Sequence, residues 1–344
     1  MPKRPTQTDV AKLAGVSRAT VSYILTDRLN NRIPITTETR RKVLQAAKQL
    51  GYQPNAMARS LRSGQSQIIG LLTPDVHNPH YLDVLDGVEQ EAAEHNYHLI
   101  LVSANLDLEN ERRCMHSLFE RRLDGLILMS TFSDLLTTEI EVLSEHTSPA
   151  VFMIPTECAD WVYPDVRSGA EQMMDHLLSL GHQRIGFIDG VARSNLSQPR
   201  QKVYEEKLTS VGLPIDEQLI RHCGHTMQDG YLAARALLDL TPRPTAIWTI
   251  NDLLAVGALR AIYERCLHVP QDVALAGFDD IALASQLYPP LTTVHMPAKE
   301  MGCRAVQILF HRIENPQLEP MQEMLSLDLI IRQSTVPNPG GESI

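Results

Sequence analysis

The first 53 residues carry apolar side chains at helical spacing in three successive stretches. The side chains that share the inner faces of these stretches are Val10, Leu13, Ala14, Val21, Ile24, Leu25, Val43, Ala46, Ala47 and Leu50. Gly15 supplies the turn between the first two stretches, and Ser17 stands where the second helix needs an N-cap. Thr36 or Thr37 can cap the third stretch, which Gly51 ends. The pattern predicts three helices that close a small common core.

After Gly64 the pattern changes to short apolar runs that alternate with amphipathic stretches. Strands are predicted at residues 67–73, 97–103, 125–130, 150–154, 184–189, 246–250 and 273–278. Helices are predicted at residues 81–96, 108–122, 169–181, 230–240, 253–265 and 299–315. Repeated strand–helix units favour α/β architecture, here two doubly wound parallel sheets rather than one. In such folds a ligand lies outside the carboxyl ends of the strands, in this chain between two subdomains.

The second predicted helix presents a small, polar and cationic stripe on its outer face, formed by Arg18, Ala19, Ser22 and Tyr23. Two short helices around a glycine turn, the second with such a stripe, are typical of a helix-turn-helix. The second helix of that motif lies in the major groove of DNA and contacts base edges. An ordinary helical hairpin in a core is the alternative for this segment taken alone.

Residues 54–64 form a short linker with Met57 and Leu61 on one helical face and Arg59 and Arg62 beside them. So few residues cannot hold a helix alone in water, and the linker is therefore expected to order only on binding. An apolar side chain next to arginines suits a wedge that enters the minor groove while the cations hold phosphates. A flexible linker with incidental residues is the alternative.

The charge of the chain is divided unequally. Its 344 residues carry a net charge of −10, yet the first 64 hold twelve lysines and arginines against three acidic residues. A basic head on an acidic body indicates that the head is the surface that meets nucleic acid. An enzyme is the main rival class, but the sequence lacks the glycine-rich phosphate loops, the nucleophile elbow and the zinc-protease motif.

The five cysteines are scattered and show no C-x-x-C spacing, which is typical of reduced thiols in a cytosol. The basic N-terminus runs into a polar helix rather than a signal peptide, and no apolar run approaches the roughly 18 residues of a membrane span. We therefore expect a cytoplasmic protein without a membrane partner. The run His222-Cys223-Gly224-His225 is more typical of a structural role than of a metal site, and neither metal nor cofactor is predicted.

The chain resembles the LacI/GalR family of bacterial transcriptional regulators over nearly its whole length. The segments that carry the resemblance are TDVAKLAGVSRATVS, LGYQPNAMARSL, IIGLLTPDVHNPHY, RLDGLIL, LGHQRIGFIDG, RPTAIWTINDLLAVGALRAI, VPQDVALAGFDDI and PPLTTVHMPAKEMG. The resemblance implies a repressor that binds a palindromic operator as a homodimer. It also implies a core like that of periplasmic sugar-binding proteins, where a small-molecule effector, a sugar or sugar derivative, controls DNA affinity. A tetramerising heptad helix is absent from the tail PNPGGESI, which favours a dimer.

The domain organisation that follows has three parts. Residues 1–53 form the helix-turn-helix domain, residues 54–64 the hinge, and residues 65–344 the effector-binding and dimerisation core. Within the core, the N-subdomain is expected at about 65–165 and 293–322, and the C-subdomain at about 166–292 and 323–344.

Carried over residue by residue, the resemblance assigns base reading to Arg18, Ala19 and Tyr23. Residues expected to touch phosphates or orient the recognition helix are Thr8, Ser17, Thr20 and Ser22. Leu61 matches the hinge leucine that enters the central minor-groove step, and the expected contacts around it are Asn55, Met57, Ala58 and Arg62. The loop at 27–36 is longer than in the shortest family members, so no contact is carried over for it.

In the core, the resemblance implies that His80 and Tyr81 form a pocket wall and that His225 stacks on the effector. Arg200, Asn251 and Asp279 match positions that hydrogen-bond effector hydroxyls. A carboxylate or amide takes vicinal hydroxyls bidentately, and an arginine fork grips ring or carboxylate oxygens. Structural roles stay open: Asp279 could cap a turn after its strand, and Asn251 could end one. The alternative functions are a regulator that responds to a non-sugar metabolite such as a nucleobase, and a ligand-binding protein without a gene-regulatory role.

Overall fold

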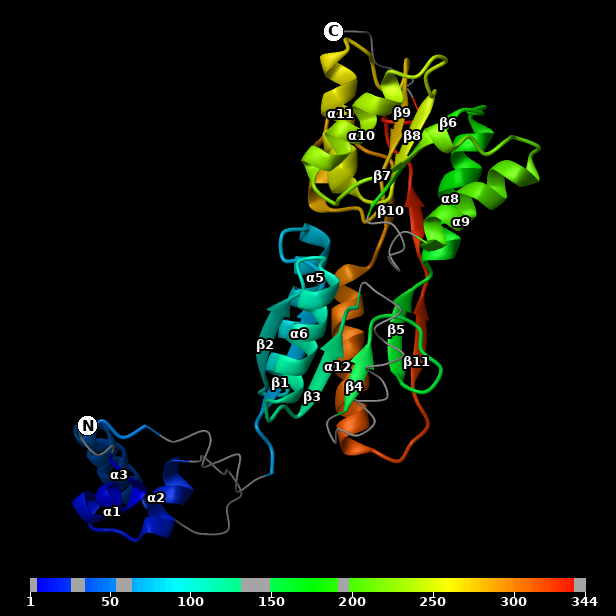
Figure 1. Cartoon of the computed structure of the whole chain (residues 1–344). Helices are drawn as coiled ribbons and strands as arrows, with labels where there is room; N and C mark the ends of the chain where they lie inside the picture. The colour runs from blue at the N-terminus through cyan, green and yellow to red at the C-terminus, as the bar shows by residue number, and fades with distance from the viewer. Residues whose placement is uncertain (1–4, 26–34, 54–63, 131–148, 191–197, 337–344) are drawn as a thin grey trace. The chain divides into compact units, whose positions relative to one another are not determined.

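The computed structural model describes residues 5–25, 35–53, 64–130, 149–190 and 198–336 (Figure 1). By their internal packing, the residues divide into two compact units, 1–66 and 67–344. Outside the described residues lie most of the 27–36 loop, the C-terminal tail and the predicted hinge contacts of Asn55, Met57, Ala58, Leu61 and Arg62.

The first unit contains three helices, α1 (Gln7–Ala14), α2 (Arg18–Leu25) and α3 (Thr37–Leu50). Thr6 begins α1 with a reciprocal capping box, because its side chain and that of Asp9 each accept from the other's backbone N–H. Thr36 caps α3, as one of the two predicted alternatives. Gly15 and Gly51 end α1 and α3 in the left-handed region, with φ of 67° and 63°. The three predicted helices are confirmed.

The core of this unit consists of Val10, Ala11, Val21, Ile24, Val43, Ala46 and Ala47. Leu13, predicted to share the inner face, is instead 47% exposed. The contact face of α1 centres on Val10, Ala11 and Ala14, and at 100° per residue Leu13 lies to one side of it.

The N-subdomain of the second unit is built on a six-stranded sheet, in the order β11-β5-β4-β3-β1-β2, whose paired strands all run parallel. Its strands are β1 (Ile68–Thr73), β2 (His98–Ser103), β3 (Gly125–Leu128), β4 (Ala150–Phe152), β5 (Asp160–Pro164) and β11 (Gln322–Leu325). Its helices are α5 (Pro79–Glu94), α6 (Leu108–Phe119) and α12 (Ala298–Glu314).

The two faces of this sheet pack against different helices. Side chains of α5 and α12 share one apolar cluster with Ile69, Leu71 and Ile127. Side chains of α6 share a second cluster with Leu72 and Leu126 from the opposite face. Because successive strand residues point to opposite faces, the central strands are apolar throughout, which explains their continuous hydrophobic runs.

The C-subdomain is built on a four-stranded parallel sheet in the order β7-β6-β8-β9. Its strands are β6 (Ile185–Asp189), β7 (Ile220–His222), β8 (Ala246–Thr249) and β9 (Ala274–Ala276). Its helices are α8 (Val166–Ser179), α9 (Gln198–Ser210), α10 (Met227–Leu238) and α11 (Asp252–Glu264), with the short 3₁₀ turns η1 (Glu217–Leu219) and η2 (Ala282–Gln286). Figure 1 shows the pair α8 and α9 on one side of this sheet and the pair α10 and α11 on the other. The predicted fold class is therefore confirmed.

A third, two-stranded antiparallel sheet lies where the chain passes between the subdomains. Its strands are β10 (Thr293–His295) and β12 (Asp328–Ile330). β10 leads into α12 of the N-subdomain, and β12 follows directly after β11 of the same subdomain. We call β10, β12 and the residues beside them, up to Arg332, the crossover strands.

Two helix pairs pack with their backbones in contact. A Cβ on Gly257 of α11 would lie 1.8 Å from the carbonyl oxygen of Met227 in α10. A Cβ on Gly302 of α12 would lie 2.1 Å from the carbonyl oxygen of Val84 in α5. Only glycine fits such a close approach, since no real Cβ tolerates these distances.

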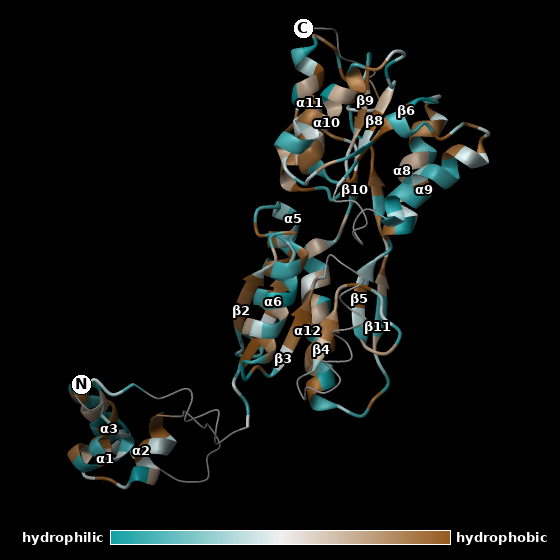
Figure 2. Cartoon of the chain, in the orientation of Figure 1, coloured by the Kyte–Doolittle hydropathy of each residue, from teal (hydrophilic) through white to brown (hydrophobic). Residues whose placement is uncertain are grey.

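Several elements were not predicted from the sequence: β5, β7, β10, β11, β12 and α9. The missed strands have only three to five residues, which is too short for a periodic signal. Helix α9 has weak amphipathicity because Arg200 occupies one of its buried positions, beside Val203, Tyr204 and Leu208. Figure 2 shows α9 as largely hydrophilic, in contrast to the apolar strands.

Candidate effector site and nucleic-acid interface

Helix α2 presents the residues predicted to read DNA. Arg18 and Ala19 are exposed, and Ser22 and Tyr23 are half-buried beside them. Val21 and Ile24 point the other way into the core of the first unit. The predicted separation of an inner apolar face and an outer polar face is therefore present.

The start of α2 is held by a side-chain cap. Ser17 Oγ accepts from the backbone N–H of Thr20 at 3.0 Å, and the two hydroxyl oxygens are 2.9 Å apart. The cap satisfies one of the donors left over at a helix start and sets the angle at which α2 leaves the turn. Thr8, exposed in the first turn of α1, is the remaining residue predicted to contact DNA in this unit.

The predicted effector residues of the C-subdomain follow the carboxyl ends of its strands. His225 follows β7, Asn251 follows β8, and Asp279 follows β9. Since paired parallel strands end at the same edge of a sheet, these side chains share one edge. The ring of His225 lies against Gly190, just after β6, where a Cβ would come within 2.6 Å of His225 Cε1.

Arg200 is a buried cation at this edge. Its guanidinium carbon lies 4.0 Å from the centre of the Phe278 ring, and its Nη2 donates weakly to Met296 Sδ at 3.9 Å. Burial lowers the pKa of Arg200, and the nearby Asp279, Tyr163 and Tyr81 oppose that shift. Arginine stays charged at neutral pH even when buried, so the site contains a fixed positive charge.

Asp279 connects the two subdomains. Burial raises the pKa of its carboxyl from the ordinary 3.8 to about 7, although Arg200 and a hydrogen bond from the Asn78 side chain oppose this. Asn78 belongs to the N-subdomain, where its Oδ1 also caps α5 by accepting from the His80 N–H at 3.0 Å. A carboxyl group with such a pKa changes protonation near neutral pH, which is typical of functional rather than structural carboxylates.

His80 and Tyr81 reach the same place from the first turn of α5. Burial, with a contribution from the nearby Arg200, lowers the pKa of His80 to about 4, so its imidazole is neutral at pH 7. Its Nδ1 is buried and has no hydrogen-bond partner among the described residues. The Tyr81 ring packs edge-on at 5.2 Å, and burial and Asp279 raise the pKa of its hydroxyl. A neutral imidazole and a neutral phenol can each donate to or accept from a ligand hydroxyl.

Asn251, for which the sequence left open only that it ends its turn or strand, caps the helix that follows. Its Oδ1 accepts from the Leu254 N–H at 2.8 Å and caps α11. An effector contact by this residue would therefore use its amide nitrogen.

Sequence reasoning missed several residues of the same cluster. Asp189, the last residue of β6, is fully buried and its Oδ2 lies 2.9 Å from Nδ1 of His222. Burial raises the pKa of Asp189, and the hydrogen bond to His222 opposes this. Phe278 and Asn78 were missed as well. Of these residues, Asp189 could have been found from the sequence, because a carboxylate at the end of a predicted apolar strand lies at the ligand edge of a parallel sheet.

The run His222-Cys223-Gly224-His225 forms no metal centre within the described ranges, where no group of three or more His, Cys, Asp or Glu could hold an ion. Instead, Cys223 Sγ donates to the Asp189 carbonyl at 3.1 Å, and His222 pairs with the Asp189 carboxylate. All five cysteines are unpaired thiols. No helix in the part of the chain that the structure covers is long and apolar enough to cross a membrane.

The cluster combines one buried cation, two buried carboxyl groups, amides, neutral imidazoles and aromatic rings from both subdomains. Buried polar groups need hydrogen-bond partners, and a compact ligand with many hydroxyls offers donors and acceptors in all directions. With the exposed face of α2, the fold and site are those of a two-part protein, with one unit suited to DNA and the other to a small polar ligand.

Comparison with known proteins agrees with this definition. Residues 6–55 match the bacterial regulatory proteins of the lacI family, and residues 174–335 match the periplasmic binding protein-like domain. The chain is 35% identical to the ribose operon repressor of Escherichia coli (strain K12), over 96% of this chain and 99% of that protein. The chain belongs to the LacI family and is a transcriptional regulator.

Solved structures of regulators have the same fold. A lac repressor dimer bound to operator and the anti-inducer ONPF superimposes with a TM-score of 0.84 at 27% identity, covering 97% of this chain and 99% of that one. A LacI family regulator from Enterococcus faecium with bound ribose gives a TM-score of 0.70 at 28% identity, covering 79% of this chain and 99% of that one.

Proposed function

We propose that this protein is a repressor that binds a palindromic operator as a homodimer in the cytoplasm, and that a sugar or sugar derivative controls its operator affinity. The observation that carries the proposal is the meeting of Asn78 and Tyr81 from one subdomain with Arg200 and Asp279 from the other. A ligand that forms hydrogen bonds with residues of both subdomains favours one relative orientation of the subdomains over the others. Differential binding of this kind is what an allosteric effector requires.

For the DNA end, the proposal assigns base contacts to Arg18, Ala19 and Tyr23 on α2. The residues proposed to touch phosphates or orient α2 are Thr8, Ser17, Thr20 and Ser22. The proposed hinge contacts are Leu61 as the minor-groove wedge, with Asn55, Met57, Ala58 and Arg62 around it. The exposure of Arg18 and Ala19 and the Ser17 cap support the assignment on α2.

For the ligand end, the proposal assigns His80, Tyr81, Arg200, His225, Asn251 and Asp279. The ribose in the Enterococcus faecium regulator supports a sugar as the ligand class. The mixture of carboxyl, amide and neutral imidazole groups around a single arginine also suits a neutral polyol better than a strongly charged ligand. A non-sugar metabolite such as a nucleobase is the second candidate, because Tyr81 and His225 could stack on a flat ring.

For self-association, the outer face of α11 supports a dimer. Val256, Leu259, Arg260, Tyr263 and Glu264 line a shallow groove there. Tyr263 is 43% exposed although it is a large aromatic residue. Exposed apolar area of this kind marks interaction sites.

The test uses the full chain and an operator obtained by in vitro selection on it. Thermal unfolding with D-ribose, other sugars or adenine identifies the ligand, because a ligand that binds only the folded state raises the melting temperature. Fluorescence anisotropy then measures operator affinity with and without that ligand. Selection of a palindrome and a ligand-dependent change in operator affinity support the proposal. Stabilisation by adenine alone favours the second candidate, and failure to select any DNA sequence refutes the regulatory role.

A further inference from the structure

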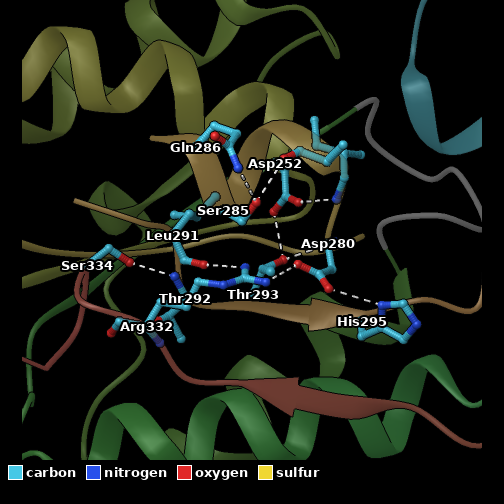
Figure 3. Close-up of polar contacts among 12 residues, drawn as sticks. Asp252, Asp280, Ser285, Gln286, Leu291, Thr292, Thr293, His295, Arg332 and Ser334 are labelled. Carbon is cyan, nitrogen blue, oxygen red and sulfur yellow. Dashed lines mark hydrogen bonds and ion pairs between the residues drawn. The ribbon is translucent and has the colours of Figure 1, made fainter. Parts of the chain in front are cut away.

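Two pairs of consecutive residues in the C-subdomain link the effector cluster to the crossover strands. In each pair the first residue belongs to the effector cluster, and the second is an aspartate whose carboxylate contacts the crossover strands. The pairs are Asn251-Asp252 and Asp279-Asp280. Figure 3 shows Asp252 and Asp280 close to Thr293, the first residue of β10. Neither carboxylate takes part in the proposed ligand contacts.

Asp280 joins both crossover strands. Its Oδ1 accepts from Arg332 Nη2 at 2.7 Å, just after β12, and its Oδ2 lies 3.1 Å from Nδ1 of His295, the last residue of β10 (Figure 3). The Asp280 and Arg332 side chains are only 16% and 19% exposed, so this ion pair is shielded from solvent more than an ordinary surface pair.

Arg332 extends this connection. Its Nη1 donates to the Leu291 carbonyl at 2.8 Å, and its backbone N–H donates to Thr292 Oγ1 at 2.8 Å. The guanidinium therefore ties the segment before β10 to the segment after β12, and Asp280 holds the guanidinium. A planar fork with several donors suits such a junction better than a lysine.

Asp252 holds the other side of the same junction. It is fully buried, with Oδ1 accepting from Thr293 Oγ1 at 2.7 Å and Oδ2 from the Ile281 N–H at 2.9 Å. Thr293 Oγ1 also accepts from the Asp280 N–H at 3.3 Å. The turn that contains Asp279 and Asp280 is thus bound to β10 from both ends.

The backbone of this turn is restrained at both of its aspartates. Asp279 and Asp280 both have positive φ, 110° and 57°, a region where few non-glycine residues are stable and few alternatives are accessible. The Asp279 N–H donates to the Val294 carbonyl at 3.0 Å, and the Met296 N–H donates to the Asp279 carbonyl at 3.2 Å. A displacement of the Asp279 carboxylate by a ligand would therefore reach Asp280 and β10 through these bonds.

We propose that Asp280 is a positioning residue for the effector response, which couples the Asp279 turn to the crossover strands through Arg332 and His295. The inference rests on the proposed function, because it concerns how ligand binding at Asp279 changes the subdomain orientation. Asp280 does not touch the ligand. Its loss keeps every residue expected to contact the ligand but separates the site from the strands about which the subdomains reorient.

The first test compares Asp280→Asn with the matched control Asp272→Asn. Asparagine keeps the shape of the side chain and is well tolerated at positive φ, so the turn is retained. Asp272 also pairs with a histidine and an arginine, His268 at 3.1 Å and Arg243 at 3.7 Å, but makes no described contact with the crossover strands. Any effect of removing a carboxylate in general therefore appears in both variants.

With D-ribose as the probe, operator affinity is measured for each protein with and without the sugar. In Asp280→Asn the sugar-dependent ratio should fall about fivefold or more toward one. The dissociation constant for D-ribose should stay within about threefold, since no ligand contact is lost. Arg332→Gln should reproduce this loss, and Arg332→Lys should retain only part of the response, because the positive charge remains but the fork that reaches both Asp280 and the Leu291 carbonyl is lost. An unchanged ratio in Asp280→Asn overturns the inference.

Hydrogen exchange on the ligand-free proteins gives a second readout that does not depend on the effector. Asp280→Asn should speed exchange in peptides covering residues 291–297 and 326–333 and also in the distant peptide carrying Asn78 and Tyr81. A change confined to the first two peptides shows a merely local structural role and overturns the inference. If the wild-type protein does not respond to D-ribose, the proposed sugar effector fails, and the exchange at Asn78 and Tyr81 still decides the role of Asp280.

Discussion

Replacement of Asp279 by Asn should stabilise the protein while abolishing its effector response. The carboxyl is 8% exposed, and its ionised form is disfavoured enough to raise the pKa to about 7. An amide of the same shape carries no charge to desolvate, and asparagine tolerates the positive φ at this position. The same change removes the carboxylate expected to bind ligand hydroxyls bidentately.

The sign and size of the effect follow from the pKa difference between the folded and unfolded chain. Between the ordinary value of 3.8 and the folded value of about 7, the folded protein binds more protons, so Asp279 lowers stability progressively as pH rises through that window. A difference of about three pKa units corresponds to at most about 4 kcal/mol in the free energy of unfolding. About 3 kcal/mol of that cost develops between pH 5 and pH 8.

The assay is urea unfolding of the full chain at pH 5, 6, 7 and 8, followed by tryptophan fluorescence. Trp248 on β8 is fully buried in the subdomain that contains Asp279 and reports on its unfolding. The quantity of interest is the difference in the free energy of unfolding between Asp279→Asn and wild type at each pH. His80, whose pKa is lowered in the folded protein, gives stability the opposite pH dependence, but its contribution is the same in both proteins and cancels in this difference. The gain should be between about 1 and 2 kcal/mol at pH 5, about 4 kcal/mol at pH 8, and constant above that.

Two results would refute the reasoning. A gain that does not change with pH would show that the Asp279 carboxyl has an ordinary pKa in the folded protein. A variant that still changes its operator affinity on ligand addition would remove Asp279 from the effector site. Asp272→Asn is the control for carboxylate removal, since hydrogen bonds from the backbone and side chain of His268 lower the pKa of that group and no pH-dependent gain is expected.

Three further predictions concern other parts of the chain. Gly257→Ala places a Cβ against the Met227 carbonyl and forces α10 and α11 apart, which should cost about 1–3 kcal/mol in urea unfolding; an unchanged midpoint would contradict the close packing. Leu61→Ala should weaken binding to the selected operator far more than binding to unrelated DNA in gel shifts at fixed salt, and equal loss of both would reject the wedge role. Arg18→Ala should cost about 1–3 kcal/mol in anisotropy with the selected operator and relax the base preference at one position per half-site, whereas uniform loss across all sequences would mean a phosphate contact.

The helix-turn-helix could be predicted because its signals are local. Gly15, Ser17 and the spacing of Val21 and Ile24 each act through near neighbours in the chain, and the structure shows the turn, the cap and the buried face as expected. The same logic failed for Leu13, because which side of a two-turn helix is covered depends on where α2 and α3 lie.

The candidate effector residues could be named from motifs, but their chemistry could not. Neutral His80, the carboxyl of Asp279 with its pKa near 7, and the buried guanidinium of Arg200 result from burial and from each other's charges. These residues are up to two hundred positions apart in the sequence, and only folding brings their charges close. Helix α9, which carries Arg200, was not predicted at all, because a buried arginine interrupts the apolar pattern that reveals a helix.

The sequence by itself determined the three N-terminal helices, the alternation of the longer strands and helices, the basic head and the likeness to a family of regulators, since composition, periodicity and short motifs are properties of neighbouring residues. The tertiary structure decided how the effector cluster is joined to the crossover strands. Asp252 and Asp280 look like ordinary neighbours of Asn251 and Asp279 in the sequence. Their proposed function depends on hydrogen bonds and ion pairs with Thr293, His295 and Arg332. These partners come near the two aspartates only because the chain passes between the subdomains and returns, and a hydrogen bond forms only when its two atoms are about 3 Å apart.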